Sequence, residues 1–182
     1  TCNEFEDFEQ GLKYLLEAEK LGRDDEWINT EIATNLGRSG KISQGIERLH
    51  KSLAMVSEED INQRIFINSE IAWLYGRLEE PQPEEALKYL NIAKDLGRND
   101  EWLYVHLWFN LERFKGKEEA LKYFENEVKD NDKNVVFWAS LGQVYMNFLE
   151  NYEEAEKAFK NAFKYSLNGQ YLYDRSKALM GL

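Results

Sequence analysis

The stretch WASLGQVYMNFLENYEEAEKAFKNA, residues 138–162, has the pattern of two short amphipathic helices joined by a turn. Near the start of the second helix stands Ala155, followed by Phe159 four residues later and by Ala162 three residues after that. Spacings of three and four place side chains on one face of a helix. Small residues on such a face let two helices approach closely, and a large ring fills the space beside them. The stretch therefore predicts a helical hairpin.

The same pattern recurs along the chain. The small residue that opens the second helix stands, in order, at Gly11, Gly45, Ala86, Ala120 and Ala155, at separations of 34, 41, 34 and 35 residues. A period near 34 with helical periodicity inside it indicates a stack of two-helix repeats. The first helices of these repeats are expected at 26–38, 62–77, 101–114 and 136–149.

A short string marks where one helix ends and the next begins. LGRDDEW at 21–27 returns almost unchanged as LGRNDEW at 96–102. Its glycine suits the left-handed backbone conformation that commonly ends a helix, and its Asp or Asn suits the N-cap position of the next helix. The glutamate that follows lies favourably in the first turn. We therefore interpret the string as a connector between helices.

The fourth repeat carries the strongest family pattern. Trp138, Leu141, Gly142 and Tyr145, followed by Ala155 and Phe159, resemble the tetratricopeptide signature. The match departs in having one extra residue in the turn and Ser166 where proline is usual. The resemblance covers essentially the whole chain. It implies an all-α fold, a right-handed superhelical solenoid of about five helical hairpins, whose first helices line a concave face that binds extended peptides or partner helices.

We expect a single solenoid over 1–182. Its parts are the second helix of a truncated first repeat at 8–22, repeats at about 25–55, 62–97, 100–130 and 135–167, and a C-terminal capping helix at 170–181. Because the pattern starts inside a repeat, we expect either a piece of a longer array or an N-terminal edge used for association between copies.

Composition limits the partners and the chemistry. A net charge of −11 argues against nucleic acid and anionic membrane surfaces, and it favours a cationic or neutral protein or peptide. The single cysteine, Cys2, excludes an internal disulfide and fits a cytoplasmic location, and no apolar run reaches membrane-spanning length. His50 and His106 lack ligand spacing, and we expect His50 to be exposed and His106 to be satisfied within its helix. No metal, cofactor or catalysis is expected.

Two equivalent rows on the first helices are the candidate peptide-binding groove. One row is Thr34, Trp73, Phe109 and Gln143, and the other, four residues further on, is Arg38, Arg77, Arg113 and Asn147. Positions i and i+4 are neighbours on a helix, and aromatic and arginine side chains dominate binding hot spots. The arginines suit a carboxylate or a phosphorylated segment. Alternatively, they pair with glutamates of the second helices or with the last helical carbonyls.

A third row opens the first helices and consists of Trp27, Phe66, Trp102 and Tyr171. Either these rings stack against a ligand or, as we expect, they wedge between adjacent repeats.

The sequence thus predicts a non-catalytic scaffold that binds a peptide or helix in its groove. Two other functions stay open. One is a self-association module that assembles through the array ends, and the other is an auxiliary region of a larger regulator or enzyme.

Overall fold

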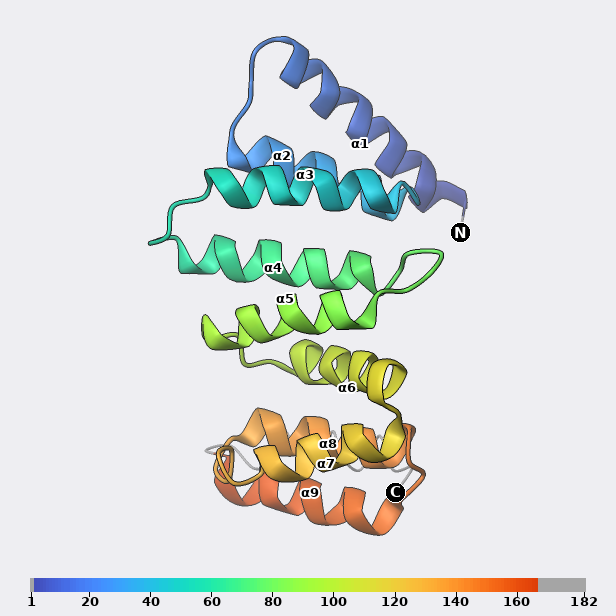
Figure 1. Cartoon of the computed structure of the whole chain (residues 1–182), viewed down its shortest axis with the longest axis vertical. Coiled ribbons are helices and arrows are strands. Elements are labelled where there is room, and N and C mark those ends of the chain that lie inside the picture. Colours follow the sequence, from blue (N-terminus) through green and yellow to red (C-terminus); the bar gives the residue numbers. More distant parts are fainter. Residues whose placement is uncertain (1, 167–182) are drawn as a thin grey trace. The chain divides into compact units, whose positions relative to one another are not determined.

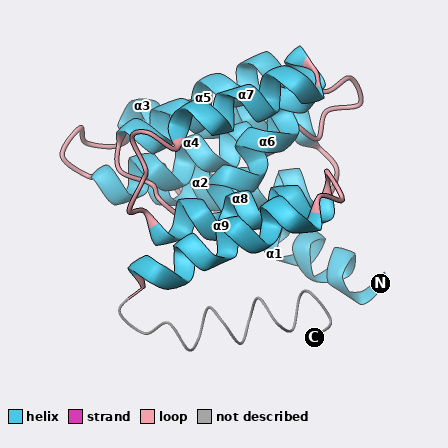
Figure 2. Ribbon diagram, turned by 90° about the horizontal axis from the view of Figure 1, so that it is seen from below, coloured by secondary structure: helices cyan, strands magenta, loops and turns pink. Residues whose placement is uncertain are grey.

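The computed structural model describes residues 2–166, with side chains from residue 8 onward, and this part of the chain is helical without strands (Figure 2). The chain divides into two compact units, Thr1–Arg98 and Asn99–Leu182, and each is described by itself. The first unit holds α1 (Cys2–Lys20), α2 (Glu26–Arg38), α3 (Ile42–Met55), α4 (Ile61–Tyr75) and α5 (Pro83–Asp95). The second holds α6 (Glu101–Lys115), α7 (Lys117–Glu127), α8 (Val135–Asn147) and α9 (Tyr152–Tyr165).

The first unit is built from consecutive hairpins. Helix α2 pairs with α3 and α4 pairs with α5, while α1 packs on α2 and α3 packs on α4 (Figure 1). Leu12 of α1 joins Ile28, Ile32 and Leu36 of α2 in one buried cluster. These positions lie three or four residues apart on α2, as expected for one helix face. Apolar burial along such faces holds each hairpin to the next.

The second unit has an aromatic core. Helix α6 packs on α7 and on α8, and α8 packs on α9. The ring of Phe124 lies between the edge-on indole of Trp108, at 5.8 Å, and the stacked ring of Phe137, at 6.0 Å. All three side chains are fully buried. Edge-on and offset-stacked rings stabilise a core beyond the area they bury.

The connectors adopt the predicted conformation. Gly22 and Gly97 have φ values of +98° and +104°, a region that favours glycine. The N-caps are Asp25, whose carboxylate accepts the Ile28 amide at 2.8 Å, and Asp100, which accepts the Leu103 amide at 2.9 Å. Pro83 opens α5, where its missing N–H costs nothing.

The predictions for the two ends of the chain have different outcomes. The structure merges the expected helix at 8–22 into the longer α1, which begins at Cys2 and continues through Gly11. No Gly or Pro precedes Gly11 to stop that helix. The predicted capping helix at 170–181 and Tyr171 lie outside the described residues. The single solenoid over 1–182 stays a prediction.

Candidate interaction face

The candidate residues of the first unit lie on one face of α2 and the matching face of α4. Phe66 and Trp73 are seven residues apart, which places them on one side of α4, and Arg77 follows four residues after Trp73, just beyond the end of that helix at Tyr75. Trp27, Thr34 and Arg38 have the same spacing on α2, which contacts α4. We call these six residues the aromatic–arginine face.

The strongest pairing on the aromatic–arginine face is between Trp73 and Arg77. The Arg77 guanidinium lies over the Trp73 ring, with its carbon 4.6 Å from the ring centroid. Trp73 is partly buried and Arg77 is exposed. A guanidinium that lies over an indole face still points its N–H donors outward in its own plane, so they remain available to a carboxylate.

The residues that α2 contributes to the aromatic–arginine face differ in exposure. Trp27 is 46% exposed, and the Arg23 guanidinium lies over it at 4.4 Å. Arg38 is exposed and lies over the ring of Phe8, at 5.2 Å. Thr34 is only 8% exposed, and its hydroxyl donates to the carbonyl of Thr30 at 3.0 Å. The prediction of Thr34 as a direct ligand contact therefore does not fit its burial.

Two carboxylates lie on the same side of α2 and α4 as the aromatic–arginine face. Glu31 and Glu70 stand four residues after Trp27 and Phe66, and both are half-buried. Burial raises the pKa of the Glu70 carboxyl, the charge of Glu31 raises it further, and Arg38 and Arg98 lower it. The aromatic–arginine face therefore presents cations at one end and carboxylates at its centre.

The arginine alternatives can be compared with the geometry. Within residues 8–166, Arg38 and Arg77 are held by aromatic rings and form no ion pair. Pairing with a glutamate of the second helix, one alternative for these arginines, is therefore not seen. Arg113 of the second unit is exposed and does have a polar or electrostatic partner.

In the second unit the predicted residues lie on α6 and α8. Phe109 is 37% exposed, and its ring meets Phe148 edge-on at 4.8 Å. Gln143 of α8 donates its amide to the Glu101 carboxylate of α6 at 2.7 Å, so it is engaged within the unit. Asn147 is exposed. The exposed candidates here are Phe109, Arg113 and Asn147.

Two members of the row of opening aromatics are partly open to solvent. Trp27 is 46% exposed and Phe66 is 42% exposed, and their wedging between repeats stays a prediction. They stand seven residues before Thr34 and Trp73 and so extend the aromatic–arginine face. The period of seven was visible in the sequence and was the signal that could have found them.

Both histidines pack against aromatic rings. His106 stacks on Trp102, with ring centroids 3.8 Å apart, and its Nδ1 lies 2.8 Å from the Trp102 carbonyl, as expected of a satisfied helix residue. His50 is half-buried against Tyr89 at 5.6 Å, so the expectation of an exposed ring is wrong. In the described part of the chain, no group of three or more His, Cys, Asp or Glu could hold a metal ion. None of the helices described there is long and apolar enough to cross a bilayer.

Comparison with known proteins supports the fold. No family model matches the sequence, and no curated protein matches it either. Among solved structures, MamA is similar with a TM-score of 0.58 and 17% identity over 87% of this chain and 88% of that one. YrrB, described as a TPR protein with an unusual peptide-binding site, is similar with a TM-score of 0.54 and 18% identity over 96% and 86% of the two chains. The fold is therefore the helical-hairpin fold of tetratricopeptide-repeat proteins.

Proposed function

We propose that this chain is a non-catalytic protein–protein interaction scaffold that binds a peptide or helix of a partner on its first helices. The observation that carries the proposal is the stacked Trp73–Arg77 pair, flanked by the exposed ring of Phe66. Trp and Arg are the side chains most enriched at binding hot spots. YrrB shares the fold and carries a peptide-binding site, which supports the same use here.

The charges of the aromatic–arginine face define the ligand further. Arg38 and Arg77 suit a carboxylate or phosphate of the ligand, because a guanidinium binds such groups through two parallel hydrogen bonds. Glu31 and Glu70 stand on the same side and suit a nearby basic group. The net charge of −11 favours approach of a ligand that is not strongly acidic overall. We therefore expect a peptide with an acidic residue next to basic or neutral ones.

The experiment selects peptides from a random library on the immobilised full chain and then measures their affinity for variants. Replacing Phe66, Trp73 and Arg77 by Ala together is expected to weaken binding by about thirtyfold or more, as for hot-spot residues. Tyr152→Ala with Phe114→Ala and Lys133→Ala removes two exposed rings and an exposed cation elsewhere and is the matched control. Far-UV circular dichroism verifies that helical content is kept. Unchanged affinity in the triple variant contradicts the proposal.

A further inference from the structure

A trough with an apolar floor runs along the first unit on the side of α2 away from the aromatic–arginine face. It consists of two adjoining hollows, of about 560 and 360 Å³, which share Leu12, Leu16 and Lys41. Its floor is Ile32 and Leu36 of α2, and its two walls belong to α1 and α3. The wall residues are Glu9, Leu12, Lys13, Leu16, Glu19 and Lys20 on the α1 side, and Lys41, Gln44, Glu47, Arg48 and Lys51 on the α3 side.

The spacing of the wall residues gives the trough its shape. On α1 they recur every three or four residues from Glu9 to Lys20, so one face of that helix follows the trough for about 16 Å, or three turns. The residues from Lys41 to Lys51 recur in the same way along α3. The trough therefore has the length and straight walls that a short helix needs.

One side chain differs between this gap and the next one along the unit. Tyr89 of α5 stands three residues after the small residue Ala86. Its ring lies 5.6 Å from the ring of His50 on α3 and 5.8 Å from the ring of Tyr75 on α4, so it joins α5 to both helices. The equivalent residue between α1 and α3 is Arg48. An aromatic ring is thus absent where the next hairpin has one.

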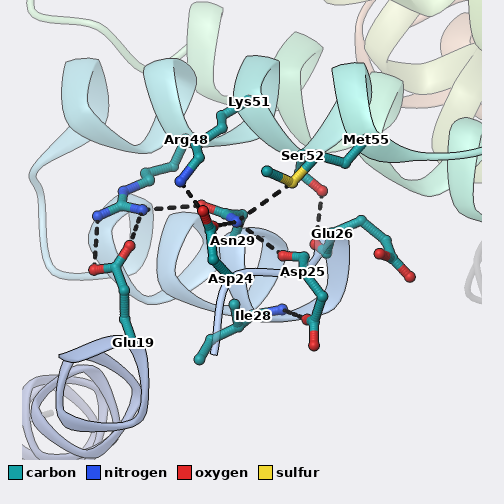
Figure 3. A network of polar contacts seen from close by, with 10 residues as sticks. All are labelled: Glu19, Asp24, Asp25, Glu26, Ile28, Asn29, Arg48, Lys51, Ser52 and Met55. Atoms are coloured by element: carbon teal, nitrogen blue, oxygen red, sulfur yellow. Dashed lines mark hydrogen bonds and ion pairs between the residues drawn. The ribbon is translucent and has the colours of Figure 1, made fainter. Parts of the chain in front are cut away.

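Arg48 is instead held at one end of the trough. Its two terminal nitrogens donate to the two carboxylate oxygens of Glu19, and Nη1 also donates to Oδ1 of Asn29 at 2.9 Å (Figure 3). This pairing lowers the pKa of the Glu19 carboxyl. Lys51 pairs with Asp24 at 2.8 Å in the same network. These two cations are therefore committed within the fold.

The remaining cations of the trough are not committed. Lys13, Lys20 and Lys41 are exposed, and within residues 8–166 they form no ion pair or hydrogen bond through their ammonium groups. Glu9 and Glu47 are the carboxylates of the rim that likewise form no ion pair or side-chain hydrogen bond within residues 8–166. Cations thus exceed carboxylates around this floor, although the whole chain carries a net charge of −11.

We propose that this trough binds an acidic amphipathic helix of a partner protein. Apolar side chains of the partner pack on Leu16, which is only half-buried, and meet just the small exposed parts of Leu12 and Leu36. Its carboxylates pair with Lys13, Lys20 and Lys41. The overall negative charge does not prevent this, because charges beyond about 8 Å are screened at physiological salt and the nearest charges decide. On α2, the floor residues Ile32 and Leu36 lie away from Trp27 and Arg38, so this inference is independent of the proposed function.

The test uses the full chain and a synthetic fluorescent peptide of about four helical turns, with leucines on one face and glutamates on the other. A second peptide carries lysine in place of every glutamate. Gln44→Trp fills the trough from an exposed position on its rim. A second variant combines Lys13→Glu, Lys20→Glu and Lys41→Glu. Its matched control combines Lys117→Glu, Lys129→Glu and Lys133→Glu, the same change of charge on exposed lysines of the second unit.

We expect saturable binding of the acidic peptide by fluorescence anisotropy, and binding of the basic peptide at least about tenfold weaker. Gln44→Trp and the trough reversal each weaken binding by about tenfold or more, while the control variant stays within about twofold. Added salt weakens binding to the wild type more than to the trough reversal, because the lysine pairs are screened.

Four results would overturn the inference. The first is equal binding of the two peptides, and the second is an affinity that neither trough variant changes. The third is no saturation of the acidic peptide up to about 1 mM. The fourth is a dimer in sedimentation equilibrium that the trough reversal dissociates, since the occupant would then be a second copy of the chain.

Discussion

A single methyl group added at Gly142 tests how the hairpins pack. A β-carbon at this position would lie 2.6 Å from Cε1 and 2.8 Å from Cδ1 of Phe159, well inside contact distance. Helix α8 lies against α9 here, so the Phe159 ring has to move by roughly 1 Å before the contact reaches the ordinary separation of about 3.5 Å.

Two opposing contributions set the size of the effect of Gly142→Ala. Overpacking a buried contact costs about 1–3 kcal/mol, whereas alanine in a helix interior gains about 1 kcal/mol over glycine. We therefore expect a net loss of about 1 kcal/mol. Phe159→Leu alone leaves a small cavity and also costs about 1 kcal/mol. Their combination restores the small–large pairing of Ala33 with Leu49 at the equivalent positions, so the double variant is expected to be close to the wild type.

Urea unfolding of the full chain, followed by tryptophan fluorescence, measures these effects. With a slope near 2 kcal/mol per molar, a loss of 1 kcal/mol lowers the midpoint by about 0.5 M. The interaction energy in the double-mutant cycle is expected to be about 2 kcal/mol in favour of the pair. A stabilised Gly142→Ala variant would show that helix propensity outweighs the contact. Additivity within about 0.3 kcal/mol would refute the small–large pairing.

Three further predictions concern polar groups. Arg48→Met leaves the carboxylate of Glu19 without its partner and is expected to cost about 2 kcal/mol at pH 7 in urea unfolding. Because the pKa of Glu19 is lowered in the folded chain, the difference from wild type should shrink as the pH falls through that pKa, to what the lost hydrogen bond to Asn29 contributes. The pKa of Glu70 is raised in the folded chain, so its contribution to stability is present below the unfolded pKa and is lost as pH rises through the folded pKa. Glu70→Gln should therefore raise the melting temperature at pH 7 and not near pH 4. An equal rise at both pH values would exclude ionisation as the cause. Asp100→Ala removes the N-cap of α6 and should cost about 1 kcal/mol, with Asp100→Asn close to wild type by thermal unfolding.

The hairpins were predictable because their signals are local. The connector string predicts a left-handed glycine and a capping aspartate, and Gly22 with Asp25 shows both. The bounds predicted for α2, 26–38, agree with the structure, since an N-cap and a period of 3.6 define them. The start of α1 was not predictable in this way. The repeat pattern predicts a helix from residue 8, but an alignment of repeats does not supply a residue that breaks the helix before that point.

The candidate face was only partly predictable. The spacing in the sequence correctly groups Trp73 with Arg77, because side chains four residues apart come close together. It gives no information on depth, so Thr34 was grouped with Trp73 although it is buried. The exposure of Trp27 was missed for the same reason, because a ring at a helix start suits both a wedge between repeats and a surface.

The trough depends on a difference between repeats rather than on what they share. Arg48 and Tyr89 are equivalent in the pattern, yet Tyr89 packs against neighbouring rings while Arg48 turns to Glu19 and Asn29. An arginine there is consistent with the helix period, so periodicity alone cannot distinguish an open gap from a filled one. The distinction arises only when a carboxylate on α1 comes within reach of the guanidinium. Arg48→Tyr therefore tests the explanation: a ring in this gap should weaken binding of the acidic peptide by about tenfold or more, as expected for Gln44→Trp, although every lysine of the rim is retained.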